Sequence, residues 1–106
     1  MNQLNAKCVA WLLFLNQFKK FFVKYPIAIN SVLEWYYKAK QADWADFESL
    51  KKTFPSTDYV GNGLFVFNIG GNKYRLIARI IFKVRTLFIR FIGTHKEYDN
   101  IKLDTL

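Results

Sequence analysis

The single histidine of the chain lies in a short polar stretch, Thr94-His95-Lys96-Glu97-Tyr98-Asp99. An imidazole and a phenol can both move protons in a reaction. In the first turn of a helix His95, Tyr98 and Asp99 would occupy positions i, i+3 and i+4, on one side. A structural interpretation is also available, because Thr94-x-x-Glu97 is a capping box in which Glu97 serves only as a cap. The stretch alone leaves both interpretations open.

The arginines indicate a phosphate-bearing partner. All four of them, Arg75, Arg79, Arg85 and Arg90, fall within sixteen positions, whereas the first 58 residues contain eight lysines and no arginine. Lysine would solubilise the chain equally well. Arginine is better suited to hold phosphate oxygens or a developing negative charge, because its planar fork donates two parallel hydrogen bonds.

The arginines belong to a segment that predicts three consecutive strands. Residues 64–69 and 86–93 are apolar and rich in β-branched or aromatic side chains, and residues 73–82 have the same character. Gly70-Gly71-Asn72 supplies the first turn and Lys83-Val84-Arg85 the second link. We therefore expect an antiparallel β-meander over residues 64–93.

Alternation within the meander predicts two different sheet faces. The even positions from 74 to 82 are all apolar or aromatic and predict a core face, so Lys73, Arg75 and Arg79 share the other face. In the next strand a core face of Leu87, Ile89 and Phe91 leaves Arg90 on the other side with Phe88 and Ile92. A solvated outer face is the plain alternative, but the number of arginines argues against it.

Three helices are expected before the meander. Phe18, Phe21, Phe22 and Tyr25 recur at helical spacing, and Pro26 ends that helix. A second helix over 27–41 is expected to face inward with Ile29, Val32, Leu33, Tyr36 and Tyr37. A third, near 44–52, has Asp43 or Asp46 as its candidate N-cap and closes at Phe54-Pro55.

Residues 8–15, an apolar run, are expected to form a buried first strand near 9–15. Eight residues are far fewer than the ~18 that a membrane span requires, and no small-residue cleavage site follows the run. The expected fold is therefore α+β: one domain over residues 1–106, with two to three helices packed on a small, mostly antiparallel sheet.

Composition favours a cytoplasmic protein with a polyanionic partner. The net charge is +8 and the pI is near 9.7. A single cysteine, Cys8, excludes an internal disulfide and a cysteine-based metal cluster. No glycine-rich nucleotide loop occurs, since Gly70-Gly71 fits a hairpin turn with no helix after it, and we expect no cofactor.

RNA cleavage without a metal is the chemistry that these residues could support. A metal-dependent nuclease needs several converging carboxylates, and residues 59–106 offer only Glu97, Asp99 and Asp104. RNA brings its own nucleophile, the ribose 2′-OH. The protein must then orient that hydroxyl, move two protons and stabilise the extra negative charge at phosphorus.

Several motifs together resemble the HigB-type toxins, which belong to the RelE-like toxins of bacterial toxin–antitoxin pairs. The resemblance rests on three segments, Val66-Phe67-Asn68-Ile69, Gly71-Asn72-Lys73-Tyr74-Arg75-Leu76 and Ile89 to Asp99, the last of which contains THKEYD. It extends back through Ala42-Asp43-Trp44 and Phe54-Pro55-Ser56, and so covers residues 18–106. The chain departs from the family pattern at its N-terminal side, where Phe14-Leu15-Asn16-Gln17 replaces basic residues after a first strand.

The resemblance implies a RelE-like fold and a ribosome-dependent endoribonuclease that cuts messenger RNA during translation. It also implies a HigA-like, helix-turn-helix antitoxin whose neutralising complex can bind operator DNA. Catalytic roles are carried over to His95, Tyr98, Arg75 and Arg79, and phosphate-binding roles to Lys73, Arg85 and Arg90.

Two other function classes remain as alternatives. A non-catalytic RNA- or ribosome-binding module could use the same basic face, with Tyr74 and Phe88 stacking on bases. A peripheral membrane protein could use the apolar run and the lysine pair Lys19 and Lys20, and we rank this hypothesis last.

Overall fold

The computed structural model describes the chain from residue 15 to residue 106, and its side chains from residue 18 onward. The strand expected near residues 9–15 lies outside this range, apart from Leu15, which is the first residue of a helix. The elements run in the order α2 (Leu15–Lys24), η1 (Pro26–Ala28), α3 (Ile29–Gln41), α4 (Phe47–Thr53), β1 (Asp58–Tyr59), β2 (Leu64–Ile69), β3 (Tyr74–Ile81), η2 (Phe82–Val84), β4 (Thr86–Thr94), α5 (His95–Asp99) and η3 (Leu103–Thr105).

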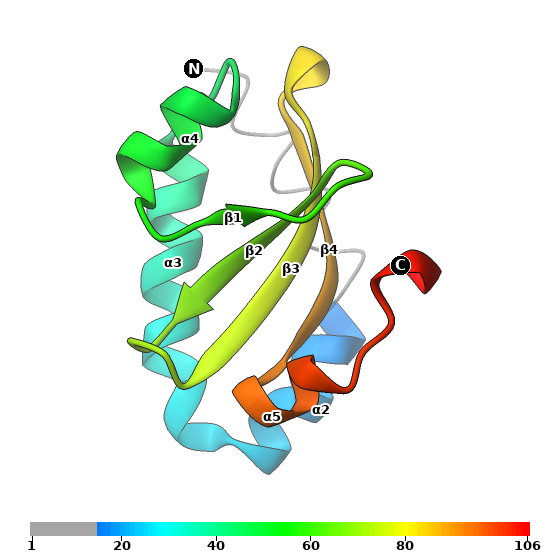
Figure 1. The fold of residues 1–106 in the computed structure, drawn as a ribbon. Coiled ribbons are helices and arrows are strands. Elements are labelled where there is room, and N and C mark those ends of the chain that lie inside the picture. Colours follow the sequence, from blue (N-terminus) through cyan, green and yellow to red (C-terminus); the bar gives the residue numbers. More distant parts are fainter. Residues whose placement is uncertain (1–14) are drawn as a thin grey trace.

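The four strands form one antiparallel sheet in the order β1-β2-β3-β4 (Figure 1). The expected meander is thus confirmed, and the α+β fold with it. Gly70 and Gly71 both have positive φ, 63° and 73°, in the turn between β2 and β3, as the turn prediction requires. The two-residue strand β1 was not expected, because Asp58 is a poor strand former and so short a strand leaves no alternation to detect.

The helices cover one face of the sheet and bury the larger of two apolar clusters. Phe18 and Phe21 of α2 are buried, and the Phe21 ring meets the Tyr74 ring of β3 edge-on at 5.5 Å between centroids. Trp35 of α3 meets Phe67 of β2 in the same manner at 5.3 Å. The predicted first helix and its aromatic stripe are therefore confirmed.

Helix α3 forms where it was expected, but the stripe that faces the sheet is only partly the predicted one: Val32 is buried and Tyr36 packs against the core, as predicted. The buried residues are Val32, Trp35 and Ala39, whereas Tyr37 is 56 % exposed. The inward orientation predicted for Ile29, Leu33 and Tyr37 was wrong, since all three side chains are exposed. Both sets of residues have helical spacing. The buried set contains Trp35, which packs against Phe67 of β2, and periodicity alone does not reveal that contact.

Helix α4 confirms Asp46 as an N-cap. The Asp46 carboxylate accepts the backbone N–H of Ser49 at 2.9 Å, and the Ser49 hydroxyl accepts the N–H of Asp46, which completes a capping box. The helix begins at Phe47, three residues after the predicted start. Asp43, the other candidate cap, is instead ion-paired with Arg85 at 2.6 Å.

A β-bulge in β4 reverses the predicted alternation of its second half. The ladder pairs Ala78 with Ile89 but Ile77 with Phe91, so Arg90 is an extra residue without a partner in the ladder. Ile89 lies in the larger core, as predicted. Beyond the bulge, Phe91 packs with Ile77 on the opposite face and Ile92 packs against the larger core, so the predicted sides of these two residues were wrong.

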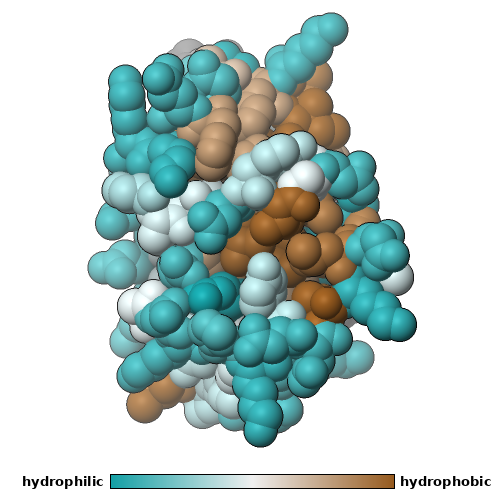
Figure 2. Space-filling view, viewed as in Figure 1, coloured by the Kyte–Doolittle hydropathy of each residue, from teal (hydrophilic) through white to brown (hydrophobic). Residues whose placement is uncertain are grey.

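The second sheet face is covered by the end of the described chain. Leu64, Val66 and Ile77 are buried there beneath Tyr98, Ile101, Leu103 and Leu106. Figure 2 views the molecule from this side and shows apolar side chains gathered beside the strands, with hydrophilic ones around them. The face that carries Arg75 and Arg79 is thus partly covered by residues 98–106. No helix within residues 15–106 is long and apolar enough to cross a membrane.

Candidate active site

Strand pairing brings four of the predicted site residues to one end of the sheet. In the ladder Tyr74 pairs with Thr94 and Arg75 pairs with Gly93. His95, the residue that follows β4, donates its backbone N–H to the carbonyl of Lys73 at 3.2 Å. The imidazole of His95 and the side chains of Lys73 and Arg75 therefore emerge from adjacent backbone positions.

The capping box places the next candidate side chain of this group, Tyr98. The Thr94 hydroxyl accepts the N–H of Glu97 at 3.1 Å, and the Glu97 carboxylate accepts the N–H of Thr94 at 2.9 Å. The expected cap is therefore confirmed, and it starts α5 directly at His95. One helical turn later the Tyr98 ring lies beneath the Arg75 guanidinium, 5.7 Å from ring centroid to Cζ.

Arg75 is oriented by two amides that the sequence analysis did not assign to the site. Its Nη1 donates to Oδ1 of Asn72 at 2.6 Å and also to Oδ1 of Asn68. Asn68 pairs directly with Arg75 in the β2–β3 ladder. A polar residue within the apolar run LFVFNI was a signal that could have found Asn68, once the short turn had fixed the hairpin register.

His95 is close to an acid on its own helix. Its Nδ1 lies 3.5 Å from Oδ2 of Asp99, four residues later, and the histidine side chain is 46 % exposed. The predicted common side of His95 and Asp99 is thus present. The carboxylate can orient the ring through Nδ1, so that Nε2 is the atom through which a proton would pass to or from a substrate.

Arg79 shares the sheet face of Arg75 but lies apart from the His95 end. Arg79 lies four positions beyond Arg75 along β3, about 13 Å at ~3.3 Å per residue. The guanidinium of Arg79 donates to the main-chain oxygens of Asn62 and Leu106, the latter at 3.0 Å from Nη2. In this structure Arg79 fastens residues 98–106 to the sheet.

Arg85 and Arg90 lie elsewhere. Arg85, in the left-handed conformation with φ 53°, closes the β3–β4 hairpin at the far end of the sheet, paired with Asp43 and the carbonyl of Phe82. Arg90 is exposed at the bulge. The structure therefore brings together Lys73, Arg75, His95 and Tyr98, and leaves the other three cations outside that group.

Burial tests the two aromatic residues that were considered for base stacking. Tyr74 is only 7 % exposed and packs against Phe21 and Tyr25, so its ring is part of the core and the stacking hypothesis was wrong for it. Phe88 is half-buried. Within residues 15–106, no group of three or more His, Cys, Asp or Glu side chains is placed to hold a metal ion.

Comparison with known proteins defines the class of this protein. Residues 28–101 match the model of the HigB_toxin family, described as the RelE-like toxic component of a toxin–antitoxin system. That range is most of the chain and includes Lys73, Arg75, His95 and Tyr98. The chain belongs to this family, as the resemblance implied.

Curated relatives agree with the family assignment. The chain is 40 % identical over 73 residues to an mRNA interferase toxin HigB of Escherichia coli strain K12, and that match covers 66 % of this chain and 62 % of the relative. An mRNA interferase HigB of Shigella flexneri gives the same values. An mRNA interferase HigB of Escherichia coli O6:H1 is 32 % identical over 80 residues, or 74 % of this chain and 78 % of the relative. The match thus spans somewhat less than two thirds of the length of the first two relatives.

Proposed function

We propose that this protein is the toxin of a type II toxin–antitoxin pair and a ribosome-dependent endoribonuclease that cleaves translated messenger RNA. The observation that carries the proposal is the convergence of His95, Tyr98, Arg75 and Lys73 at one end of the sheet. His95 can carry a proton, and Arg75 and Lys73 place two positive charges at the same end of the sheet. The relatives are named mRNA interferases, which supports the same activity.

The proposed reaction uses the nucleophile that RNA itself provides. The ribose 2′ oxygen attacks the adjacent phosphorus, the bond from phosphorus to the 5′ oxygen breaks, and a 2′,3′-cyclic phosphate remains on the upstream fragment. One proton leaves the 2′-OH and one reaches the departing 5′ oxygen. In this mechanism the cationic side chains stabilise the negative charge that develops on the phosphorane.

Each side chain has a proposed part in this reaction. His95 is the acid or base, oriented through Nδ1 by Asp99. Arg75, held by Asn68 and Asn72, contacts the scissile phosphate together with the exposed Lys73, and Tyr98 assists proton transfer or stacks on a base. Arg79, Arg85 and Arg90 are proposed to hold phosphates further from the His95 end of the sheet, and Arg79 must leave the oxygens of Asn62 and Leu106 to do so.

Primer extension after brief induction in a bacterial host tests this function. Two reporter messenger RNAs are compared, one with its start codon and one without it. We expect cuts only in the translated reporter. When His95→Ala is expressed in place of wild type, we expect no cuts in either reporter. Cuts in both reporters would contradict the ribosome requirement.

A non-catalytic binding module is the second candidate, because the same cations would also hold an uncleaved RNA. Burial of Tyr74 removes one of the two aromatic platforms proposed for it. Inhibition of translation without any cut in either reporter, from a folded protein, would favour this candidate over the nuclease.

The family description implies an antitoxin, and we propose a HigA-like helix-turn-helix protein in that role, acting in the cytoplasm. An acidic surface on the antitoxin would complement the net charge of +8. The resulting complex is proposed to bind operator DNA. Co-purification of the chain with the product of the neighbouring gene would test the pairing.

A further inference from the structure

Glu97 makes two sets of contacts, one with each carboxylate oxygen. Oε1 accepts the backbone N–H of Thr94 at 2.9 Å and completes the cap of α5. Oε2 accepts from Nζ of Lys24 at 3.1 Å and from the hydroxyl of Tyr25 at 3.3 Å. Lys24 ends α2 and Tyr25 follows it, more than seventy residues away in the sequence. A cap requires only the first set, so the second set needs a separate explanation.

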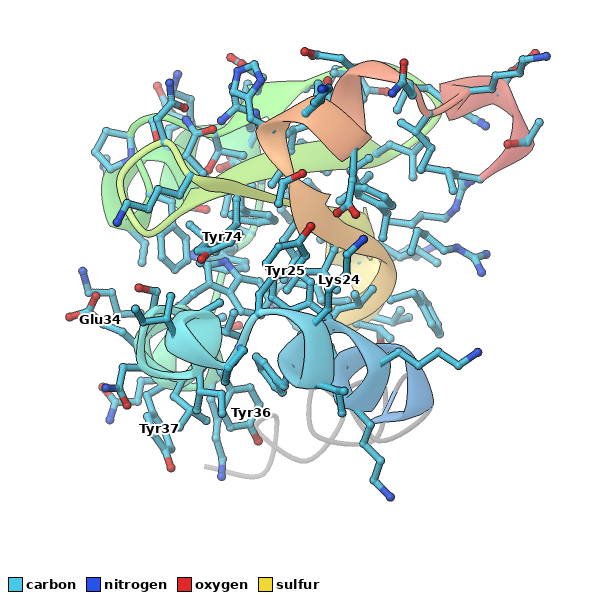
Figure 3. The ribbon with its side chains drawn as sticks, turned by 90° about the horizontal axis from the view of Figure 1, so that it is seen from below. Lys24, Tyr25, Glu34, Tyr36, Tyr37 and Tyr74 are labelled. Atoms are coloured by element: carbon cyan, nitrogen blue, oxygen red, sulfur yellow. The ribbon has the colours of Figure 1, made fainter. Side chains whose placement is uncertain are left out.

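Of the two contacting residues, Tyr25 is itself held in place by packing, whereas the Lys24 side chain is largely exposed. The Tyr25 ring packs against Phe21 at 5.3 Å and against Tyr74 at 6.1 Å between centroids, and Tyr74 directly precedes Arg75. Figure 3 shows Lys24 and Tyr25 extending from the end of α2 toward α5, with Tyr74 beside them. Glu97 therefore joins α5 to a fixed point of the core.

Gly93 leaves the space that this arrangement needs. A Cβ at residue 93 would lie 2.7 Å from Oε1 of Glu97 and 2.7 Å from Cζ of Phe91. Gly93 also pairs with Arg75 in the ladder. The carboxylate of Glu97 thus packs directly on the backbone of the residue opposite Arg75.

A five-residue helix has little intrinsic stability, so its position depends on contacts outside the helix. We propose that Glu97 is a positioning residue of the reaction, which fixes α5 against α2 and thereby sets His95 and Tyr98 relative to Arg75. The carboxylate itself stays outside the chemistry. This inference rests on the proposed nuclease function, in which α5 carries the proton-moving groups.

The decisive variant leaves Glu97 intact and removes its partners. In Lys24→Met/Tyr25→Phe the cap of α5 remains, but the tie to α2 is lost. Cleavage is measured on purified ribosomes in a single turnover, with toxin in saturating excess, and the half-saturating toxin concentration is measured separately. We expect the cleavage rate to fall about 3–10-fold and the half-saturating concentration to change less than twofold, because the altered groups are not proposed to touch RNA.

Two controls separate positioning from general effects. Lys20→Met removes a lysine from the same helix that forms no hydrogen bond or ion pair with Glu97, and it should leave the rate within twofold. Asp46→Ala removes the equivalent capping box of α4, far from the site, and should lower stability without lowering the rate. If Lys24→Met/Tyr25→Phe cleaves as fast as wild type, the inference is overturned.

Glu97 variants test the competing idea that the carboxylate is a catalytic acid or base. Glu97→Gln can still accept the Thr94 N–H, so positioning predicts a rate between those of wild type and Glu97→Ala. If Glu97→Gln and Glu97→Ala lose the same cleavage rate while Lys24→Met/Tyr25→Phe keeps that of wild type, Glu97 belongs to the chemistry. That result would contradict positioning.

A measurement without activity keeps the inference testable if the proposed function fails. When wild-type protein does not cleave RNA, the function fails, and the NMR signals of the Tyr98 ring then decide the inference alone. Shifted or broadened ring signals in Lys24→Met/Tyr25→Phe, but not in Lys20→Met, would support positioning of α5. Unmoved signals would overturn it.

Discussion

Asn68 and Asn72 together determine where the guanidinium of Arg75 points. Both amide oxygens accept from the same nitrogen, Nη1, while the Tyr98 ring lies beneath the guanidinium. A guanidinium held in advance avoids the entropic cost of ordering it at the moment when charge develops on the phosphate. We therefore regard Asn68, which pairs with Arg75 across the hairpin, as part of the site.

Asn68→Ala should lower the cleavage rate about 10-fold with little loss of stability. The variant frees Arg75 from one of its two amide partners, and a half-buried hydrogen bond of this kind contributes only about 0.5–1.5 kcal/mol to folding. Single-turnover cleavage on ribosomes and urea unfolding measure the two effects. Asn30→Ala, at an exposed position of α3, is the matched control, and equal rates for the two variants would remove Asn68 from the site.

Gly93→Ala should destabilise the protein by about 1–3 kcal/mol, the usual range for overpacking. The added Cβ would meet the Glu97 carboxylate and the Phe91 ring at 2.7 Å each. Gly71→Ala is a contrasting case, because nothing lies near that Cβ but the backbone has φ +73°. Both variants should lose stability in urea, but only Gly93→Ala should also disturb the Tyr98 NMR signals. Undisturbed signals in Gly93→Ala would show that the space at Gly93 does not position α5.

At the scale of elements, α5 depends on charge as well as on packing. The backbone N–H of Thr94, and then the Lys24 ammonium, hold the pKa of Glu97 below its ordinary value of 4.5. The same hydrogen bond to Glu97 raises the pKa of Lys24. A carboxyl with a lowered pKa binds fewer protons when folded than when unfolded, so it stabilises the fold above 4.5 and loses that contribution as the pH falls through the folded pKa.

The free energy of unfolding, measured as a function of pH, should therefore distinguish wild type from Glu97→Gln. We expect wild type to be more stable near pH 6 and the difference to shrink as the pH is lowered from about 4.5. Hydrogen bonds with Ser49 likewise lower the pKa of Asp46. Wild type and Glu97→Gln share that group, so its effect cancels in the difference between them. Urea unfolding at several pH values measures the difference in unfolding free energy between the two proteins. A difference that does not change with pH would contradict the role of the Glu97 charge.

Sequence patterns predicted the elements better than the faces that they present. Hydrophobic spacing located α2, α3 and the three long strands, since local periodicity determines them. The inward face of α3 was wrong because Ile29, Leu33 and Tyr37 have the same helical spacing as the buried stripe. The bulge at Arg90 could not be foreseen from alternation, because one inserted residue reverses the sides of everything after it.

The same distinction applies to the candidate site. Alternation placed Lys73 and Arg75 on one strand face, and the capping box placed His95 and Tyr98 in one helical turn. That the two pairs meet depends on the β3–β4 register, which includes the bulge and was not predicted. The contacts of Arg79 with Leu106 and of Glu97 with Lys24 join segments distant in sequence. Such contacts depend on how residues 98–106 and α2 pack on the sheet, which neither periodicity nor composition specifies.

At the scale of the whole molecule, one end of the sheet holds the proposed chemistry and the rest of the molecule supports it. The helices bury one face, residues 98–106 cover part of the other, and the net charge of +8 favours a polyanionic substrate. Membership in the family of RelE-like toxic components agrees with this arrangement. The proposed function places RNA cleavage, by attack of the ribose 2′-OH, at the His95 end of the sheet.

The most direct test is to identify the new RNA ends after cleavage on purified translating ribosomes. We expect a 2′,3′-cyclic phosphate on the upstream fragment and a 5′-hydroxyl on the downstream fragment. Both ends should form in the presence of a metal chelator at concentrations that leave the ribosomes intact. His95→Ala should slow formation of these ends at least 100-fold, since general acid–base catalysis contributes about 10²–10⁴-fold. A 3′-hydroxyl with a 5′-phosphate would instead show attack by water and contradict the account.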